Sequence, residues 1–218
     1  MITLTNEDNM ELMSRYPDNY FDIAIVDPPY GIGNFTKEGS KRKGKPNKKW
    51  EIEWNNTIPD EYYFRELKRV SKNHIIFGFQ YYTKHLWDDL QNVIIHDFGS
   101  TGGWGSDADL AITNLHSKQK CKVAFFKYRW QGFIKGNVNE SDKNRIHPCE
   151  KPLSLYEWIL MDYAKEGYKI LDTHLGSGSI AIAAHNLGFE LTGCELDKEY
   201  YEAACKRLKR HQAQLTMF

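Results

Sequence analysis

Short apolar runs alternate with segments of helical spacing along most of the 218-residue chain, and this alternation restricts the fold more than any other feature. Six runs have the length and composition of strands, at residues 21–26, 74–79, 93–98, 122–126, 169–175 and 191–196. Five segments have apolar positions at helical spacing, at residues 61–70, 81–90, 153–164, 180–187 and 198–210. Strands that alternate with helices are typical of a mainly parallel sheet with helices on both faces. The pattern predicts a single α/β domain over residues 1–218.

One pair of strands departs from this rule. No helical segment is evident between the runs at residues 93–98 and 122–126. We therefore expect these two strands to pair in the antiparallel direction, because a parallel pair needs a longer crossover connection.

The composition excludes several classes of protein. The 29 Lys and Arg residues balance the 29 Asp and Glu residues, so net charge gives no overall attraction to nucleic acid or membranes. No apolar run approaches the ~18 residues of a membrane span, and the first residues lack the basic start and apolar core of a signal peptide. The four cysteines form no CxxC pair and the histidines show no ligand spacing. We expect a cytoplasmic protein with reduced thiols, no metal site and no membrane partner.

Two segments interrupt the alternation. Residues 31–56 lack apolar periodicity and contain seven basic residues between Lys37 and Lys49, against one acidic residue, Glu38. Residues 99–146 are rich in glycine, aromatic and basic residues near both ends. An insertion of this length in a compact domain is usually functional or disordered. Neither segment has the composition of a linker between domains.

Residues 169–197 have the pattern of a site for a nucleoside-type ligand. An apolar strand ends at Asp172, a turn with Gly176, Ser177 and Gly178 follows, and a helix of small residues leads to a second strand that ends at Glu195. Glycines let the backbone approach a ligand, a helix amino terminus offers free N–H groups, and an acid about 20 residues later can accept ribose hydroxyls.

Two classes of cofactor fit this pattern. A dinucleotide site uses GxGxxG, and the alanine at position 181, in place of the third glycine, is tolerated. Asp172, however, stands four residues before the first glycine, where its carboxylate would repel a pyrophosphate and attract the ammonium group of S-adenosylmethionine. The charge favours S-adenosylmethionine over a dinucleotide. A glycine turn with a purely structural role is the alternative to both.

The sequence Asp27-Pro28-Pro29-Tyr30 ends the apolar run 21–26 abruptly. Methylation of an exocyclic amine is difficult because the nitrogen lone pair is delocalised into the ring. Hydrogen-bond acceptors for both amino hydrogens favour a pyramidal nitrogen, whose lone pair is available for the reaction. The Asp27 carboxylate can accept one hydrogen, and the Pro28 carbonyl, which has no helical or sheet partner, can accept the other. Pro29 makes the turn rigid, and Tyr30 offers an aromatic face to a flipped base. A structural turn would explain the prolines but neither the acid nor the tyrosine.

These motifs resemble those of the amino-methylating DNA methyltransferases that use S-adenosylmethionine. The resemblance rests on DPPY and on LDTHLGSGS at residues 171–179. Because the catalytic motif precedes the cofactor motif, and HPCEKP at residues 147–152 leads into the latter, the chain resembles the circularly permuted beta group. RWQGF at residues 129–133 is similar to a segment of small phage and prophage adenine methylases. The resemblance implies a Rossmann-like methyltransferase fold in a bacterial or phage-infected cell.

The resemblance also implies roles for individual residues. It places these residues at the cofactor: Asp8, Lys151, Pro152, Asp172, Thr173, His174, Gly176, Ser177, Gly178 and Glu195. Lys151 and Pro152 would lie near the methionine moiety and Asp8 near the adenine ring. The family usually has Asp-Pro-Phe where this chain has Asp172, Thr173 and His174, so His174 replaces an aromatic residue that packs against the cofactor and the catalytic loop.

Double-stranded DNA is the partner that the resemblance implies. The basic run after the catalytic corner is expected to contact phosphates, although a solvated loop is the alternative. Its residues are Lys41, Arg42, Lys43, Lys45, Lys48 and Lys49. Trp104, Arg129 and Trp130 are candidates for base readout in a target-recognition region at residues 99–146. A short recognition sequence is expected, and a homodimer is compatible with the family.

The aspartate of the catalytic motif favours adenine as the target, since the cytosine-N4 enzymes of this family more often have serine there. We predict methyl transfer from S-adenosylmethionine to N6 of a flipped adenine. Cytosine N4 is the nearest alternative, and an amine of RNA or protein is more remote. A DNA-binding relative with an inactive site is the alternative from a different functional class.

Overall fold

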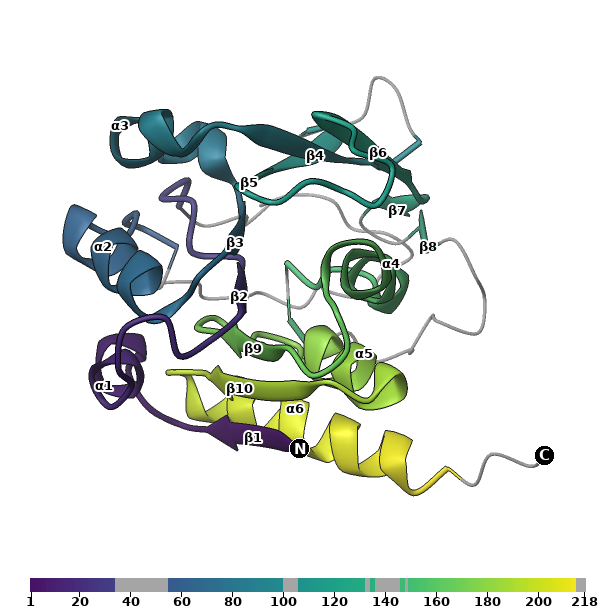
Figure 1. The fold of residues 1–218 in the computed structure, drawn as a ribbon. Helices are drawn as coiled ribbons and strands as arrows, with labels where there is room; N and C mark the ends of the chain where they lie inside the picture. Colours follow the sequence, from purple (N-terminus) through teal and green to yellow (C-terminus); the bar gives the residue numbers. More distant parts are fainter. Residues whose placement is uncertain (34–54, 100–105, 132–133, 136–145, 148, 215–218) are drawn as a thin grey trace.

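The computed structural model describes residues 1–33, 55–99, 106–131, 134–135, 146–147 and 149–214 (Figure 1), with the backbone alone at 130–131 and 134–135. An eight-stranded sheet forms the centre, in the order β1-β10-β9-β2-β3-β5-β4-β6. Its strands are β1 (Ile2–Thr5), β2 (Ile23–Val26), β3 (His74–Phe77), β4 (Asn92–Asp97), β5 (Ala108–Thr113), β6 (Val123–Lys127), β9 (Lys169–Asp172) and β10 (Glu190–Cys194). The short strands β7 (Trp130–Gln131) and β8 (Ile134–Lys135) form a separate antiparallel pair.

Most of the large sheet is parallel. Strand β5 runs antiparallel to both of its neighbours, β3 and β4, and the other adjacent pairs of the described sheet are parallel. The carboxyl ends of β1, β10, β9, β2 and β3 therefore meet at one edge of the sheet, where open α/β sheets bind their ligands.

Helices cover both faces of this sheet. They are α1 (Asn9–Ser14), α2 (Glu61–Val70), α3 (Thr83–Leu86), α4 (Leu153–Tyr163), α5 (Ser179–Leu187) and α6 (Lys198–Gln212), with 3-10 turns η1 (Phe79–Tyr81) and η2 (Trp87–Asp89). Figure 1 shows α1, α2 and α3 on one side of the sheet and α4 and α5 on the other. Among these described helices none is both long enough and apolar enough to cross a bilayer.

The apolar run of β2 is continuous because both of its faces are buried. Ile23 and Ile25 pack in a cluster with residues of α4 and α5, whereas Ala24 and Val26 pack with residues of α1 and α2. A strand in the middle of a doubly covered sheet needs apolar side chains at every position rather than at alternate ones. The run ends at Val26, so the next residue, Asp27, stands at the edge of the sheet where the carboxyl ends of the parallel strands meet.

The expected antiparallel pairing of the strands near 93–98 and 122–126 is wrong. These strands are β4 and β6, and they pair in parallel. An unpredicted strand, β5, lies between them in the chain and reverses the chain direction. The chain runs along β4 and then back along β5, which pairs antiparallel with β4. It next enters β6 on the other side of β4, so β6 runs in the same direction as β4.

The predicted helix over residues 81–90 is not continuous either. The segment forms η1, the single-turn helix α3 and η2. The backbone of Tyr82 leaves helical geometry (φ −117°, ψ 14°), and its hydroxyl bonds to carbonyls outside the segment. The remaining predicted helices and strands are present within a few residues of their expected bounds, and β1 and α1 are additional.

Candidate active site

An open cavity of 330 Å³ lies at the carboxyl ends of the parallel strands. It is lined by residues from loops that follow β1, β2, β9 and β10 and from the segment before α4. Eleven of the predicted catalytic and cofactor-binding residues line it: Asp8, Asp27, Pro28, Pro29, Tyr30, Lys151, Thr173, His174, Gly176, Ser177 and Glu195. The fold therefore brings two distant segments, the Asp-Pro-Pro-Tyr corner and the glycine turn, to one space.

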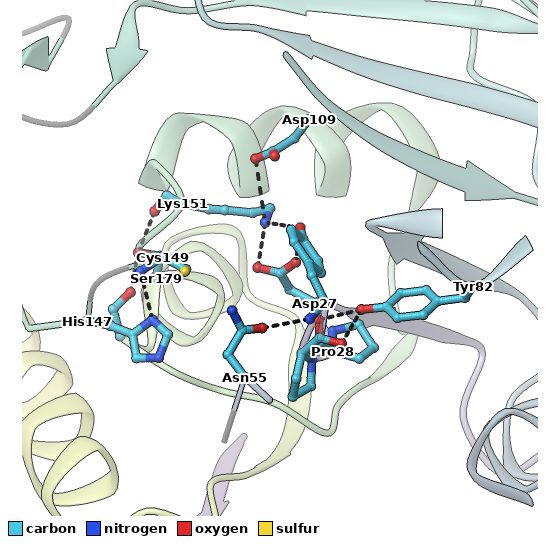
Figure 2. A network of polar contacts seen from close by, with 12 residues as sticks. Asp27, Pro28, Asn55, Tyr82, Asp109, His147, Cys149, Lys151 and Ser179 are labelled. Carbon is cyan, nitrogen blue, oxygen red and sulfur yellow. Dashed lines mark hydrogen bonds and ion pairs between the residues drawn. The ribbon is translucent and has the colours of Figure 1, made fainter. Parts of the chain in front are cut away.

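Asp27 follows β2 directly and is held from two sides. Its Oδ1 accepts a hydrogen bond from the hydroxyl of Tyr30 (2.6 Å), and its Oδ2 accepts one from Nζ of Lys151 (2.5 Å; Figure 2). The side chain of Asp27 is 15% exposed and that of Lys151 is 6% exposed. A carboxylate has about four lone-pair sites, so each oxygen of Asp27 keeps capacity for a further donor.

The carbonyl of Pro28 has a partner that the sequence did not indicate. The hydroxyl of Tyr82, a fully buried residue, lies 2.6 Å from the carbonyl oxygen of Pro28 and 2.7 Å from that of Pro29. The expectation that the Pro28 carbonyl has no partner thus holds for helix and sheet bonds but not for side chains. A carbonyl oxygen has two lone pairs, and a hydroxyl carries one hydrogen, so acceptor capacity remains at this corner.

Tyr30 is fixed by packing on a glycine and by polar contacts with Asn55, Asp27 and Lys151. Its ring stacks on Tyr81 at 4.9 Å and lies so close to Gly78 that a Cβ there would be 2.2 Å from the ring. Gly78 also has a φ of +72°, which favours glycine. The backbone N–H of Tyr30 donates to Oδ1 of buried Asn55 (2.8 Å). These contacts hold the tyrosine against Asp27 rather than leaving it free.

Lys151 lies between two carboxylates (Figure 2). Its Nζ contacts Asp27 and is 3.6 Å from Oδ2 of Asp109, a residue of β5. Nζ also lies 4.6 Å from the centre of the Phe77 ring. Burial lowers the pKa of Lys151, but the carboxylates of Asp27 and Asp109 outweigh it and the net shift is upward. The lysine is therefore held as a cation in contact with the predicted catalytic carboxylate.

The glycine turn is joined to Glu195 at the end of β10. Oε2 of Glu195 accepts the N–H of Gly176 (2.8 Å), and Oε1 accepts the N–H of Asp197 (3.0 Å). Burial raises the pKa of Glu195, and the N–H groups of Asp197 and Gly176 oppose this shift. Gly178, with a φ of +73°, lies where a Cβ would be 3.0 Å from that of Ala204, so it allows α6 to pack against the turn.

Asp172 and Pro152, like Gly178, do not line the described cavity. The Asp172 side chain is almost completely buried, and its Oδ1 accepts the N–H of His174 (3.0 Å). Burial raises the pKa of Asp172 to about 8, although the bond from His174 opposes the shift. Pro152 is buried at the start of α4. Contact of these residues with a ligand stays a prediction.

His174 connects three elements beneath the cavity. Its Nε2 is 3.1 Å from Nδ2 of Asn9 on α1, and its Nδ1 is 2.9 Å from Oγ1 of Thr173. Oγ1 of Thr173 is in turn 2.7 Å from the hydroxyl of Tyr63 on α2. Burial lowers the pKa of His174 to about 4, so the ring is neutral at pH 7. His174, which the resemblance in sequence assigned a packing role, therefore also makes hydrogen bonds.

Asp8 begins α1 and accepts the N–H of Met10 at Oδ1 (2.7 Å), while it also lines the cavity.

The segment that contains Lys151 packs over the glycine turn. Oγ of Ser179 donates to the carbonyl of Lys151 (2.9 Å), and the ring of His147 lies against that of Tyr200 at 4.6 Å. The segment before α4 therefore contacts both the Asp-Pro-Pro-Tyr corner, through the Lys151 side chain, and the residues that follow the glycine turn, through the Lys151 carbonyl.

Most of the predicted DNA-binding residues lie outside the described residues. These are Lys41, Arg42, Lys43, Lys45, Lys48, Lys49 and Trp104, and for Trp130 the backbone alone is described. Arg129 is exposed at the end of the sheet region, just after β6. Within the described part of the chain, no group of three or more His, Cys, Asp or Glu side chains is placed to hold a metal ion.

Four residues at the site were missed in the sequence. Tyr82 lay inside a segment read as a regular helix, and Asp109 lay in the strand that was not predicted. Asn55 and Tyr63 bond to cavity residues from distant positions in the chain. Only the apolar run around Asp109, ADLAIT, carries a local signal, since its length and composition are those of a strand.

Comparison with known proteins agrees with this geometry. Residues 106–206 match a family model described as DNA methylase. The Type II methyltransferase M.HpaI of Haemophilus parainfluenzae is 26% identical over 228 residues, which cover 91% of this chain and 71% of the relative. Both sequence matches are to DNA methyltransferases.

Solved structures support the same fold. M1.HpyAVI in its S-adenosylmethionine complex has a TM-score of 0.56 at 20% identity, over 95% of this chain and 100% of that one. The cytosine-N4-specific PvuII DNA methyltransferase has a TM-score of 0.61 at 12% identity, over 100% and 89%. The fold is the Rossmann-like fold of S-adenosylmethionine-dependent DNA methyltransferases, as the sequence predicted. S-adenosylmethionine is the cofactor of this class of enzymes, which is the cofactor that the sequence favoured over a dinucleotide.

Proposed function

We propose that this protein transfers the methyl group of S-adenosylmethionine to N6 of an adenine that is flipped out of double-stranded DNA, and that residues 1–218 form one methyltransferase domain. One observation carries the proposal. The carboxylate of Asp27 lines the same cavity as Gly176 and Glu195, so an acceptor for an amino group and a nucleoside-type site face one space. The choice of adenine rests on the aspartate in the first position of the Asp-Pro-Pro-Tyr motif.

The residues of the cavity fit this cofactor. The volume of 330 Å³ lies within the usual range for small-molecule sites. The carboxylate of Glu195 stands at the end of β10, where it can accept ribose hydroxyls while it holds Gly176. Asp8 offers a further acceptor on the same wall. When bound, the cofactor supplies a methyl group whose bond to sulfur breaks, with the electron pair left on sulfur, as the bond to the target nitrogen forms.

The chain's own residues prepare the target nitrogen. Asp27 can accept one amino N–H at a free lone pair, and the Pro28 carbonyl, which shares the Tyr82 hydrogen with Pro29, can accept the second. Tyr30 and Lys151 hold the Asp27 carboxylate in place, so that little reorganisation is needed when the base enters. After transfer, the proton that leaves the nitrogen goes to the carboxylate of Asp27, the nearest base.

The contacts with DNA are proposed from the sequence. Lys41, Arg42, Lys43, Lys45, Lys48 and Lys49 would neutralise phosphates beside the flipped base, and Trp104, Arg129 and Trp130 would contact bases. Replacement of the six basic residues by glutamine should reduce the slope of log affinity against log salt by several units, since each phosphate contact contributes about 0.9. An unchanged slope would leave the segment a solvated loop.

The first experiment is to incubate the protein with mixed-sequence DNA and S-adenosylmethionine, digest the DNA to nucleosides and identify the methylated product by mass spectrometry. N6-methyladenine is the expected product. N4-methylcytosine would retain the chemistry and reverse the choice of base; the fold shared with the PvuII enzyme makes it the second candidate. Cofactor binding without methylated DNA would point to an RNA or protein substrate, or to an inactive DNA-binding relative.

The variant Asp27→Ala tests the assignment of the catalytic carboxylate. It should abolish transfer and leave S-adenosylmethionine binding largely intact, at most about tenfold weaker, because Asp109 remains as a partner for Lys151 while one negative charge near the sulfonium is lost. Turnover is measured with tritiated cofactor, and binding by calorimetry. Undiminished turnover would remove Asp27 from the mechanism.

A further inference from the structure

Asp109 is a second acidic residue in contact with Lys151, although it does not line the described cavity. It comes from β5, the strand that the sequence did not predict, and it faces Nζ of Lys151 from the side opposite Asp27 (Figure 2). Its side chain is 22% exposed, whereas that of Lys151 is 6% exposed. Burial raises the pKa of Asp109, and the ammonium of Lys151 opposes this shift. The lysine therefore helps to keep Asp109 as a carboxylate.

The formal charges of these three side chains contribute to the field beside Asp27, together with the acidic residues that line the cavity, such as Asp8 and Glu195. Asp27 and Lys151 alone sum to zero, and the cation in contact with Asp27 would oppose any further positive charge there. With Asp109 the three side chains carry a net charge of −1. The proposed reaction begins with a positive charge on sulfur and develops one on the target nitrogen, next to Asp27. A net negative charge favours both.

We propose that Asp109 is a positioning residue of this methyl transfer: by sharing Lys151 with Asp27, it offsets the positive charge of the lysine, which would otherwise oppose a cationic methyl donor and a developing ammonium beside Asp27. This inference rests on the proposed function. It assigns to Asp109 no contact with substrate, since its action on the reaction passes through Lys151. The same ion pair keeps Asp27 oriented, because Lys151 is bound from both sides.

The test compares two ligands that differ in charge at sulfur. S-adenosylmethionine is a sulfonium, and S-adenosylhomocysteine is the corresponding neutral thioether. Contacts that both ligands make contribute equally to the two dissociation constants and cancel in their ratio. This ratio therefore measures the preference of the site for the sulfonium over the neutral thioether. In Asp109→Asn this preference should fall about tenfold relative to the wild type, as expected for a unit charge several ångströms away in a partly buried site. Calorimetry measures both constants without turnover.

Asp107→Asn is the matched control. Asp107 lies two residues away and is exposed, and its backbone carbonyl, which the substitution retains, accepts the N–H of Phe98 (3.0 Å). Asp107→Asn removes the same unit charge at an exposed position, where water and salt screen it, so the preference for the sulfonium should not change. Asp109→Glu, which retains the carboxylate, should restore most of the preference. In single-turnover assays at saturating cofactor, Asp109→Asn should lower the rate constant of transfer about tenfold and leave the half-saturating DNA concentration unchanged.

A double variant keeps the inference testable if Asp109→Asn does not fold. Lys151→Met together with Asp109→Asn leaves Asp27 alone, with the same net charge of −1 as the three wild-type side chains, and Asp27 keeps the hydrogen bond from the Tyr30 hydroxyl. Its preference for the sulfonium should therefore match that of the wild type. A preference unchanged in Asp109→Asn, or lost in the double variant, would overturn the inference. If instead the wild type binds neither ligand and methylates nothing, the proposed function itself fails.

Discussion

The hydroxyl of Tyr82 lies 2.6 Å from the carbonyl oxygen of Pro28 and joins the residue between η1 and α3 to the Asp-Pro-Pro-Tyr corner. Tyr82 is fully buried, so its hydroxyl has no alternative partner in water, and burial raises its pKa far above the ordinary value. The proline ring of Pro29 removes a backbone donor at the corner. The tyrosine hydroxyl supplies the donor that the neighbouring backbone cannot.

Tyr82→Phe should therefore loosen the corner without opening a cavity. We expect a loss of about 1–2 kcal/mol in the free energy of unfolding, because two buried carbonyls lose their donor. The rate of transfer should fall about tenfold, since the acceptor for the second amino hydrogen is no longer held. The affinity for S-adenosylmethionine should stay the same. Urea denaturation, single-turnover assays and calorimetry measure the three quantities.

Tyr81→Phe is the control for this substitution. It retains the ring that stacks on Tyr30 at 4.9 Å and removes a hydroxyl from the adjacent position. Its rate should remain within about twofold of the wild type. If Tyr82→Phe also retained the full rate, the Pro28 carbonyl would not need to be held by Tyr82.

The parts of the fold that were predicted correctly depend on local sequence. The apolar run of β2 is buried on both faces, and the acids at the ends of β9 and β10 follow their strands directly. In a parallel sheet these strand ends meet at one edge, so the relative positions of Asp27 and Glu195 follow from the pattern. The placement of both in one cavity needed no long-range information.

The parts that were missed depend on contacts between distant residues. Asp109 belongs to a strand that pairs antiparallel with two neighbours, and nothing in its own segment indicates that it faces Lys151. Tyr82 interrupts a helix-like pattern because its hydroxyl bonds to Pro28, 54 positions away in sequence. His174 departs from the pattern of the methyltransferases that the sequence resembles, and its partners Asn9 and Tyr63 are on α1 and α2. Single-sequence patterns cannot predict such pairs.

His174 should make stability depend on pH. Its pKa in the folded protein is about 4, against an ordinary 6.5, because burial disfavours the charged ring. Between these values the unfolded chain binds a proton that the folded protein does not, so this residue makes the free energy of unfolding fall as the pH drops from 6.5 to 4. Above pH 6.5 it contributes no slope. Chemical denaturation at pH 7 and pH 5 measures the difference.

The variant His174→Gln separates this contribution from that of other groups. Glutamine does not titrate, so the loss of stability between pH 7 and pH 5 should be smaller than in the wild type. His116→Gln, at an exposed position, should leave the loss unchanged. An equal pH dependence in the wild type and in His174→Gln would mean that the ring is not held in its neutral form by the fold.

Glu195 should contribute both to the affinity for S-adenosylmethionine and to the conformation of the glycine turn at Gly176. Its two oxygens accept the N–H groups of Gly176 and Asp197, and one face of the carboxylate lines the cavity. Glu195→Gln should weaken S-adenosylmethionine binding about tenfold to a hundredfold, the range for a hydrogen bond to a charged acceptor. Glu190→Gln, on the exposed start of the same strand, is the control and should have no effect. Equal affinity in Glu195→Gln and the wild type would place the ribose elsewhere.

Lys151 should be among the most important residues for stability as well as for the reaction. Lys151→Met fills the same volume but leaves the carboxylates of Asp27 and Asp109 in a largely buried site without a cation. We expect a loss of about 3–5 kcal/mol in the free energy of unfolding at pH 7, the cost of breaking a buried pair at one partner. Lowering the pH should reduce the loss, because protonation of the carboxylates removes their mutual repulsion.

Lys68→Met is the matched control, since Lys68 pairs with Asp89 at 2.8 Å and is 37% exposed. An exposed pair contributes about 0.5 kcal/mol or less, so this variant should unfold at nearly the same urea concentration as the wild type. Similar losses in the two variants would contradict the buried pair as a source of stability. A loss in Lys151→Met that did not diminish at low pH would instead assign the effect to packing against Phe77, because packing does not depend on the charge of the carboxylates.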